Sequence, residues 1–517
     1  MYIHSAPKTM DYWTNPLQLI LATLFIIILL HLLIRKRNLH SKQAPEPGGS
    51  WPLIGHLRVI SGNVPLYKKL ASWSDLYGPA FTLRLGFHRM LILSSRNLAK
   101  LCFTENDRNF STRPKSQAAK VIGYDSAMIG FAPSGPHWRK ARKITTVHLL
   151  SLTSLEAIRH LYGLWVGNRQ DPVKVNMRDI LGTLTFNFTA RMGAGKCNIR
   201  RDDVEIRRVR ALIEETFFLM GASSLCDALP FVWFLDLGGY KRKMRKVAKE
   251  LDLIARGWVA DHRRRKIIPG GDSSEYSGDR DFIDVLLSLV KEGEWPGSHE
   301  VDTVIKAIVL DLLMAATDTT TVTLEWAFTL LMNNPNVLRK AQDELDTQVG
   351  TNRRVNESDI EQLKYLKAIL KETSRLYPSA PTLAPHEAIQ DCQVGSFHVP
   401  AGTRLLVNVW QIHRDPHTWL QPEEFYPERF LTSHSEVDVH GQHFELLPFG
   451  SGRRSCPGSL FALQLMHLTL ATLLHSFDWA TPSGKAVDMA EGLGITLPRA
   501  IPLELIANPR LPFVLYE

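Results

Sequence analysis

The sequence predicts a mainly α-helical domain with small β-sheets, set behind a single N-terminal transmembrane helix. Helix-like hydrophobic periodicity dominates residues 65–345 and returns at 359–377 and 459–477, while strand-like pieces are short. The apolar segment 17–34 stands apart near the N-terminus and is long enough to cross a bilayer. Because 44% of the 517 residues are hydrophobic, the remainder of the chain can bury one large core.

Charge and cysteine content argue against several classes of protein. The formal net charge of +9 fits an acidic partner or an anionic membrane surface. We expect no nucleic-acid partner, because no basic helix is interleaved with aromatic residues and no zinc-finger spacing occurs. The five cysteines are scattered and form no C-x-x-C pair, so neither a disulfide framework nor a structural zinc site is expected.

The N-terminal apolar segment is predicted to be a membrane anchor. It runs from Leu17 to Ile34 and is followed at once by the basic residues 35–37, whereas only Lys8 precedes it. The positive-inside rule then places residues 1–16 in the lumen and everything after the span in the cytosol. A cleaved signal peptide is the alternative. It is disfavoured because the apolar run is long and no small-residue cleavage site follows.

The anchor is followed by a stiff connection and then by one large domain. Residues 35–52 are basic and then dense in Pro and Gly, which cannot continue a helix and therefore predict a hinge. No second linker interrupts residues 53–517, so we expect a single catalytic domain there. The polar, Gly- and Ser-rich segment 269–281 is interpreted as a surface loop of that domain.

One predicted helix is unusually long and has an unusual centre. Val301 to Met332 contains no Gly or Pro, and Asn333-Asn334-Pro335 ends it. It is apolar on nearly every side over residues 304–316, which predicts burial. The segment 317–321 instead consists of residues of poor helix propensity. Its threonines are β-branched, and threonine and aspartate side chains can form hydrogen bonds with nearby backbone groups. A weak point inside a buried helix indicates function.

The remaining elements follow from capping and turn signals. A helix is expected over 359–377, begun by a Ser358/Glu361 capping box and stopped by Pro378. Strand-like pieces occur at 80–85, 90–93 and 404–409. The last strong helix, 459–477, begins directly after Cys456-Pro457-Gly458.

The segment before this last helix carries the strongest chemical signal. In Phe449-Gly-Ser-Gly-Arg-Arg-Ser-Cys-Pro-Gly458, Gly450 and Gly452 permit positive φ angles and Gly458 permits close backbone approach. Cys456 lies at a helix start, where free N–H groups favour the thiolate. Arg454 adds a positive charge suited to a carboxylate. A lone cysteine here would more often be buried and inert, but the surrounding residues favour a metal ligand.

This segment resembles the signature Phe-x-x-Gly-x-Arg-x-Cys-x-Gly of the cytochromes P450. The resemblance extends from the hinge to the C-terminus and implies the P450 fold with haem b (iron protoporphyrin IX) as cofactor. It implies that Cys456 is the proximal ligand of the iron and that Phe449 packs beside it and tunes the thiolate. A thiolate axial ligand favours O–O cleavage at haem iron.

Two further residues match the Glu-x-x-Arg motif of this family. Glu372 and Arg375 form an i,i+3 pair, which by itself is usually a surface ion pair worth little. The apolar stripe of their helix points away from them, so periodicity leaves both exposed. The resemblance instead implies burial against Arg429, in a structural triad that serves folding and haem retention.

The centre of the long helix resembles the oxygen-activation motif of the family, with Asp318 and Thr319 as its acid–alcohol pair. A hydroxyl bonded back to a helical carbonyl opens a groove, and a nearby carboxylate can relay protons. The family commonly has glycine where this chain has Ala316, whose methyl group narrows the groove. The alternative is that these threonines simply pack in a buried helix.

Other residues match haem contacts of the family. Trp138 and Arg142 fit its Trp-x-x-x-Arg pattern and, with His386 and Arg454, would contact the haem propionates. Taken alone, an i,i+4 Trp/Arg pair is more often a surface cation–π contact, and a lone histidine is usually structural. A basic face toward a redox partner is expected from four residues that are otherwise a solvated charge run, namely Arg139, Lys140, Lys143 and Arg453.

The run from Pro385 to Trp419 resembles that of plant membrane-bound P450s that oxidise alkaloids, flavonoids, lignans and terpenoids. This resemblance implies the endoplasmic reticulum membrane as the location. It implies hydroxylation, demethylation or ring closure with O2. NADPH–cytochrome P450 reductase would supply the electrons, since the chain has no Gly-x-Gly-x-x-Gly site. A P450-fold isomerase or dehydratase and a non-catalytic haem- or ligand-binding membrane protein remain alternatives. The substrate pocket would be apolar and would be formed by Val121, Phe217, Phe218, Ala315, Leu383 and Leu493.

Overall fold

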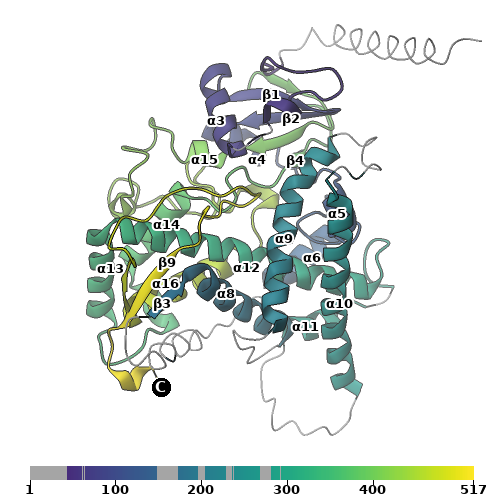
Figure 1. Ribbon diagram of the computed structural model, residues 1–517. Helices are drawn as coiled ribbons and strands as arrows, with labels where there is room; N and C mark the ends of the chain where they lie inside the picture. The colour runs from purple at the N-terminus through teal and green to yellow at the C-terminus, as the bar shows by residue number, and fades with distance from the viewer. Residues whose placement is uncertain are drawn as a thin grey trace, which may run out of the picture.

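A computed structural model describes residues 43–60, 62, 64–147, 163, 173–195, 204–228, 236, 238–267, 281–291 and 293–516. The predicted anchor 17–34 and the lumenal segment before it lie outside the described residues. Helices dominate and the sheets are small, which confirms the predicted fold class (Figure 1). The α-helices are α2 Leu57–Ile60, α3 Leu66–Tyr77, α4 Arg96–Phe103, α5 Gln117–Val121, α6 Pro136–Val147, α8 Met177–Ala194, α9 Val204–Asp227, α10 Tyr240–Ile267, α11 Phe282–Leu289, α12 Val301–Asn333, α13 Pro335–Gln348, α14 Lys364–Leu376, α15 Val409–Ile412 and α16 Ser459–Ser476.

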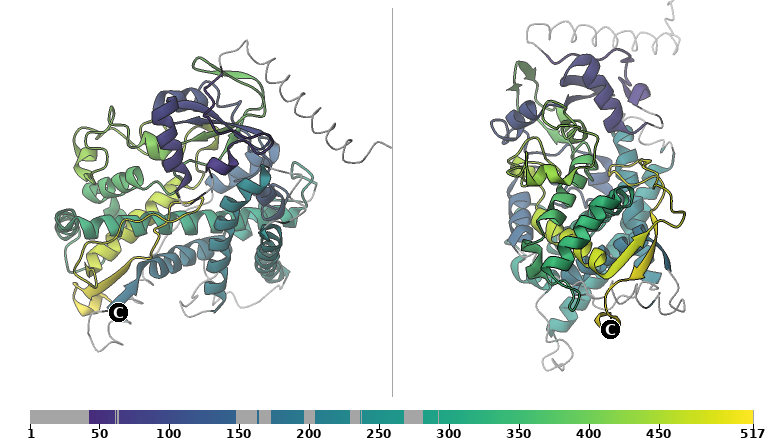
Figure 2. Two further views of the ribbon diagram at one scale, coloured as in Figure 1. Left: turned by 45° about the horizontal axis from the view of Figure 1, so that its top comes forward. Right: turned by 90° about the vertical axis from the view of Figure 1, so that its left-hand side faces the viewer.

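The largest described sheet joins segments that are far apart in sequence. Its order is β1-β2-β7-β4, with β1 antiparallel and β7 parallel to β2, where Met90 pairs with Arg404. Figures 1 and 2 place this sheet and α3 at one end of the molecule, and the C-terminal strands at the other. The strands of the largest sheet are β1 Ala80–Leu85, β2 His88–Leu93, β4 His386–Glu387 and β7 Arg404–Val407.

Two smaller sheets complete the β structure of the described chain. One has the antiparallel order β3-β9-β8 and brings residue 173 beside the C-terminal strand, where Val173 pairs with Ala507. The other is a hairpin of β5 and β6. These strands are β3 Val173–Asn176, β5 Cys392–Val394, β6 Phe397–Val399, β8 Phe477–Ala480 and β9 Glu504–Pro509.

Helix α12 is the axis of the domain. Its 33 residues correspond to a length of roughly 50 Å at 1.5 Å per residue, and it crosses the molecule between α14 and α8 (Figure 1). Nine apolar residues of segment 304–314 belong to one large apolar cluster, while four residues of segment 324–331 belong to a second. The polar segment 317–321 lies between these two apolar parts. The helix therefore links two cores through a polar centre.

Two described helices, α12 and α16, are long and apolar enough to cross a membrane. The structure buries 72% and 67% of their most apolar windows inside the domain, so both are core helices. This burial accounts for their composition without a bilayer.

The helix predicted over 359–377 is wrong at its start. The chain first forms a 3₁₀ turn, η2 Glu357–Glu361, and α14 begins only at Lys364. The capping box is formed by Asn356 and Asp359, because these two side chains reach each other's backbone N–H groups. Ser358 and Glu361 therefore lie inside the turn rather than at a helix start. Three other 3₁₀ turns are described, η3 Pro427–Leu431, η4 Gly452–Arg454 and η5 Phe513–Leu515.

Candidate haem–thiolate active site

The segment before α16 forms a tight loop around a cysteine. Gly450 and Gly452 both have φ of 68°, as the sequence predicts for these glycines. A side chain at Gly452 would overlap the carboxylate of Asp107, which accepts the Arg453 N–H at 2.9 Å. The Cys456 N–H donates to the Phe449 carbonyl oxygen at 2.9 Å, and this bond closes the loop.

Gly458 differs from the two glycines before it. Its φ is −100°, and no described atom outside its two chain neighbours lies within 4 Å of the position that a Cβ would occupy. The protein chain alone therefore does not require glycine at this position, and the predicted close backbone approach is not formed by described protein atoms. What the backbone contributes is its N–H group, which forms a hydrogen bond with the sulfur of Cys456. The open side of Gly458 leaves space for a flat group beside that sulfur.

Cys456 has accessible surface, although protein atoms surround the residue. Its sulfur therefore faces a space inside the domain rather than bulk solvent. Burial raises the pKa of its thiol above the ordinary value. The Gly458 N–H and the Arg142 charge lower this pKa, while Asp311 on α12 raises it. The expected preference for thiolate at this helix start is therefore outweighed by desolvation. A coordinating metal cation would supply the remaining driving force for deprotonation.

Two arginines bind backbone carbonyls around this loop. Arg142 on α6 donates to the Ser455 carbonyl oxygen at 2.6 Å and to its hydroxyl at 3.1 Å. Arg454 donates to the carbonyl oxygens of Ser111 and Ala132 at 2.5 Å and 2.6 Å. Both side chains are thus held in place by neutral acceptors, which leave their positive charges uncompensated.

A third arginine completes a cationic cluster. Arg113 donates to the carbonyl oxygens of Ala384 and Pro385 at 2.7 Å and 2.8 Å, and its Nε is buried and has no partner in the described part of the chain. Burial and repulsion from neighbouring guanidinium groups lower the pKa of Arg113 to about 10 and that of Arg454 to about 9. No described carboxylate forms an ion pair with Arg113, Arg142 or Arg454. Buried positive charges without counter-charges are costly, so such a cluster is suited to binding an anion.

The other two predicted haem contacts lie beside these arginines. The Arg454 guanidinium stacks 4.1 Å from the ring centre of the buried Trp138. His386 is buried, and its Nδ1 lies 2.7 Å from the Phe110 carbonyl oxygen. Burial, with the charges of Arg113 and Arg454, lowers the pKa of His386 well below its usual value. A neutral ring that donates from Nδ1 leaves Nε2 without a proton, so an anion there must bring one.

The centre of α12 contains buried polar atoms that lack partners. Thr319 donates its hydroxyl to the Ala315 carbonyl oxygen at 2.7 Å, and Thr321 makes the same bond to Thr317. The Thr317 and Thr320 hydroxyls and Oδ2 of Asp318 are buried, and none has a partner among the described residues. Native proteins rarely bury polar atoms unpaired, so this concentration marks a functional segment.

Asp318 has an acidity unlike that of a surface carboxylate. Burial raises its pKa from 3.8 to about 6. A hydrogen bond with Thr496 and the charge of Arg178 lower this pKa, and the charge of Glu214 raises it further. A carboxyl group that titrates near neutral pH is suited to proton transfer.

The cysteine loop lies alongside this helix centre. Ala316 packs against the apolar cluster that Leu184 of α8 forms with Phe461 and Leu465, and these last two lie in the first turns of α16, directly after the loop. Cys456 also interacts electrostatically with Asp311, two turns before Asp318 on α12. Ala315 is exposed although most of its helix is buried. The loop and the polar centre of α12 are thus neighbours.

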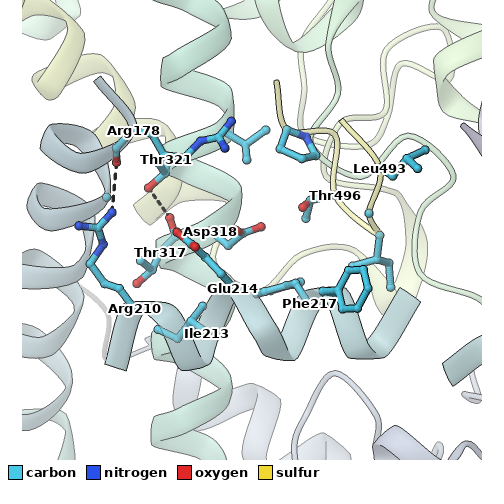
Figure 3. A pocket seen from close by; sticks show the side chains of 16 residues that line it. Arg178, Arg210, Ile213, Glu214, Phe217, Thr317, Asp318, Thr321, Leu493 and Thr496 are labelled. Carbon is cyan, nitrogen blue, oxygen red and sulfur yellow. Dashed lines mark hydrogen bonds between the residues drawn. The ribbon is translucent and has the colours of Figure 1, made fainter. Parts of the chain in front are cut away.

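A cavity of about 180 Å³ adjoins Asp318 (Figure 3). Three predicted pocket residues, Phe217, Phe218 and Leu493, line it. The other three, Val121, Ala315 and Leu383, do not. Leu383 has a positive φ of 52° and lies near Gly450 on the cysteine-loop side. The cavity is lined by Arg178, Gly182, Arg210, Ile213, Glu214, Phe217, Phe218, Thr317, Asp318, Thr321, Val322, Leu493, Gly494, Ile495, Thr496 and Pro498.

Glu372 and Arg375 on α14 are fully buried, contrary to their periodicity. The Glu372 carboxylate accepts two bonds from Arg375, at 2.7 Å and 2.8 Å, and one from Arg429 at 3.0 Å. The reason is that η3 packs across the face of α14 that its apolar stripe leaves free. Because η3 covers the side of α14 that carries Glu372 and Arg375, neither charge reaches solvent.

The chain matches a family of known proteins over nearly its whole length. The model of the family described as Cytochrome P450 matches residues 45–502. The chain belongs to the cytochrome P450 family. This membership makes it a haem-dependent monooxygenase, and the loop around Cys456 is the part of the fold that carries the family signature.

Plant relatives of this P450 are similar from end to end. A flavonoid-6-hydroxylase of Mentha piperita is 44% identical, over 96% of this chain and 98% of its own. A strychnine-10-hydroxylase of Strychnos nux-vomica is 45% identical over 91% and 92% of the two chains. A methyltetrahydroprotoberberine 14-monooxygenase of Papaver somniferum is 44% identical over 98% of both.

Solved structures are similar as well. A zebrafish cytochrome P450 determined with progesterone superposes with a TM-score of 0.72 at 26% identity. It covers 87% of this chain and 100% of its own. The arrangement of helices and small sheets is therefore that of the family.

The described residues fit the haem that a cytochrome P450 carries. The sulfur of Cys456 faces an internal space, and the side of Gly458 beside it is open. Arg113, Arg142 and Arg454 provide buried positive charge for the two carboxylates of the cofactor. A ligand sulfur, open space and uncompensated cations thus occur together.

Two residues of this P450 site were not identified from the sequence. Arg113 precedes a proline in a segment without periodicity, and only its tertiary contacts reveal it. Asp311 on α12 is partly exposed. Its carboxylate accepts the Gly130 N–H at 3.0 Å, and desolvation raises its pKa to about 6. Its signal was available in the sequence, because it is an acidic residue inside an apolar run.

Proposed function

We propose that this cytochrome P450 oxidises a small lipophilic plant specialised metabolite such as an alkaloid, flavonoid, lignan or terpenoid. O2 is the oxidant, electrons come from NADPH, and the oxidation is a hydroxylation, a demethylation or a ring closure. Flavonoid and alkaloid hydroxylases among its relatives support this substrate range. The observation that carries the proposal is the pairing of the Cys456 loop with the under-partnered centre of α12.

Each residue of the loop has a defined task in this proposal. When bound, haem iron with a thiolate ligand supplies O2 activation and O–O cleavage. Cys456 would be the metal ligand, the Gly458 N–H would stabilise its negative charge, and Phe449, whose carbonyl oxygen accepts the Cys456 N–H, would pack beside the sulfur as the family resemblance implies. Arg142 and Arg454 would bind the propionates of the cofactor, with Trp138, His386 and Arg113 beside these two arginines.

The centre of α12 is the part of the site that transfers protons. Thr319 holds its hydroxyl on the Ala315 carbonyl oxygen, where it can turn toward a ligand in the adjoining space. Asp318 titrates near neutral pH and passes protons toward that space. The triad of Glu372, Arg375 and Arg429 fixes the fold around the site and takes no part in the chemistry.

The partners follow from the surface and from the N-terminal sequence. We place the anchor at 17–34 after a lumenal segment 1–16, the hinge at 35–52 and the catalytic domain at 53–517. The anchor holds this domain on the cytosolic side of the endoplasmic reticulum membrane. NADPH–cytochrome P450 reductase docks on the basic face that includes the exposed Arg139, Lys143 and Arg453.

The test is the carbon monoxide difference spectrum of reduced microsomes that contain the full chain. Cys456→Ser is expected to lose the thiolate-type band completely, whereas the control Cys392→Ser, at another free cysteine, keeps it. Retention of that band in Cys456→Ser, or folded wild-type protein without porphyrin, contradicts the proposal. A screen of aromatic and terpenoid plant compounds for substrate-induced spin-state shifts then identifies the substrate class.

A further inference from the structure

The cavity beside Asp318 contains a second carboxylate. Glu214 on α9 lines the same cavity as Asp318 on α12 (Figure 3). Glu214 is exposed, whereas Oδ2 of Asp318 is buried and has no partner among the described residues. Glu214 is thus the acid of this pair that is open to solvent, and Asp318 is the acid with a buried oxygen.

The two arginines that line this cavity already have hydrogen-bond or ion-pair partners elsewhere in the protein. Arg178 on α8 pairs with Glu325 at 3.0 Å and donates to the Arg499 carbonyl oxygen at 2.9 Å. Arg210 on α9 donates to the Thr183 hydroxyl at 3.0 Å. These two arginines, with Glu214, are the charged groups that line the cavity around Asp318, and segment 493–498 adds the Thr496 hydroxyl. The positive charges are thus anchored to α8, α12 and the C-terminal segment.

The cavity has room for water. Its volume of about 180 Å³ compares with roughly 30 Å³ for one water molecule in the liquid, so several water molecules fit. Threonine hydroxyls and two carboxylates in its wall can hold such water by hydrogen bonds. A connected file of water between the two acids is therefore compatible with both the size and the chemistry of the cavity.

We propose that Glu214 is the solvent-side member of a proton relay that returns protons to Asp318 through water in this cavity. The inference rests on the proposed function, because it needs Asp318 to deliver protons during turnover. Glu214 does not touch the reacting atoms and acts only through Asp318, which makes it a positioning residue.

Each transfer in the relay is balanced. The O–H bond of the Glu214 carboxyl breaks, its proton passes to cavity water, and a proton from the far end of the water file forms an O–H bond with Asp318. Glu214 then takes a replacement proton from bulk water. No oxidant or reductant takes part, and the net result is one proton moved from solvent to Asp318.

The negative charge of Glu214 has a second effect. A like charge disfavours ionisation of Asp318 and helps to hold its pKa near neutral pH. Removing that charge must lower the pKa of Asp318, so the same residue both supplies the proton and tunes its acceptor.

The experiment compares Glu214→Gln with Glu214→Asp and with Glu215→Gln in the full-length, haem-loaded enzyme with reductase. Glu215→Gln removes the same charge from the next position of α9, which does not line the cavity. The first readout is the infrared band of the protonated Asp318 carboxyl, assigned by subtraction of Asp318→Asn and followed against pH. Glu214→Gln is expected to lower this pKa by roughly half a unit to one unit, and Glu215→Gln to leave it unchanged.

The second readout is product formed per NADPH consumed, with the carbon monoxide band as a check that the haem site is intact. Glu214→Gln is expected to reduce this ratio at least about threefold at neutral pH, within the range for removal of an acid–base group. Glu214→Asp should restore most of it.

The outcomes separate the two proposals. A wild-type enzyme without NADPH-dependent product overturns the proposed function and the relay with it. Normal wild-type turnover, with Glu214→Gln matching Glu215→Gln in both readouts, overturns the relay alone. A pKa shift without any loss of product per NADPH also overturns the relay, because charge tuning is then the whole effect of Glu214.

Discussion

Two buried polar regions of this cytochrome P450 differ in whether their hydrogen-bonding groups have partners. In the triad on α14, each oxygen of Glu372 accepts hydrogen bonds from guanidinium groups. Arg375 and Arg429 bond further to backbone carbonyls. At the centre of α12, Asp318 has a buried oxygen without a described partner, and so do two neighbouring threonines.

This difference distinguishes buried charges that hold the fold together from buried charges that take part in the reaction. A buried ion pair with complete hydrogen bonding fixes one arrangement of the chain and leaves no capacity for a ligand. An unpaired buried group is costly to the fold and is kept where a substrate, water or dioxygen will use it. Mutations in the first region should therefore damage folding, and mutations in the second should damage turnover.

The largest expected effect is at the triad. Glu372→Gln leaves two buried guanidinium groups without a counter-charge and should destabilise the domain by about 3–5 kcal/mol. We expect little or no haem-containing protein in expression and denaturant-unfolding measurements. Glu361→Gln removes the same charge from an exposed position nearby and is expected to be neutral. A fully folded Glu372→Gln variant contradicts the structural role.

Asp318→Asn should have the opposite effect on stability. The folded-state pKa of Asp318, about 6, exceeds its usual value of 3.8, so ionisation opposes folding above pH 6 and has no effect below about pH 4. The amide should stabilise the domain by about 2–3 kcal/mol at pH 7.5, at about 1.4 kcal/mol per pKa unit. The gain should vanish as the pH falls from 6 to 4.

Unfolding measured across this pH range checks the prediction, together with turnover, which should fall by at least about tenfold. Asp302→Asn, half exposed at the start of the same helix, is the control and should change stability by less than about 1 kcal/mol. A loss of stability in Asp318→Asn at pH 7.5 would show that the carboxylate is structural.

Two of the three glycines of the cysteine loop, Gly452 and Gly458, give a smaller contrast. Gly452→Ala forces a side chain into a positive φ and onto Asp107, which should cost about 1–3 kcal/mol of stability. Gly458→Ala has no such strain and should change stability by less than about 0.5 kcal/mol. Its methyl group enters the open space beside Cys456, so its haem content should fall. Equal haem content in Gly458→Ala and wild type, measured per folded protein, contradicts that use of the space.

A small effect on stability with a clear effect on turnover is expected within α12. Thr319→Val and Thr323→Val each remove a hydroxyl bonded to the carbonyl four residues earlier, and each should change stability by less than about 1 kcal/mol. Only Thr319→Val should lower product formed per NADPH, by several-fold, because Thr319 lies at the polar centre beside Ala315. Equal coupling in the two variants removes Thr319 from the proposed mechanism.

Much of the fold could be predicted from local signals. The Gly- and Pro-free run of α12 and its stop at Asn334-Pro335 predicted that helix almost to the residue, because termination and periodicity are local properties. The predicted start of α14 is wrong, since two overlapping capping signals compete there and the chain uses the one formed by Asn356 and Asp359.

The site could also be predicted in part, because some of its features depend on local sequence. Gly450 and Gly452 adopt the predicted positive φ angles, because only glycine tolerates that conformation without strain. The buried positions of Glu372 and Arg375 went against periodicity, which cannot register the second layer that η3 adds. Arg113 was missed because its neighbours in space, Ala384 and Pro385, lie some 270 residues away in sequence.

The sequence by itself determined the fold class, the course of the long core helix and the cysteine loop. Each of these depends on residue types at short, fixed spacings. Only the tertiary structure decided which buried charges are paired and which are not. Desolvation and hydrogen bonding depend on what packs against a side chain from elsewhere in the chain. That is why the acidity of Asp318, the arginine cluster and the Glu214 cavity become visible only in three dimensions.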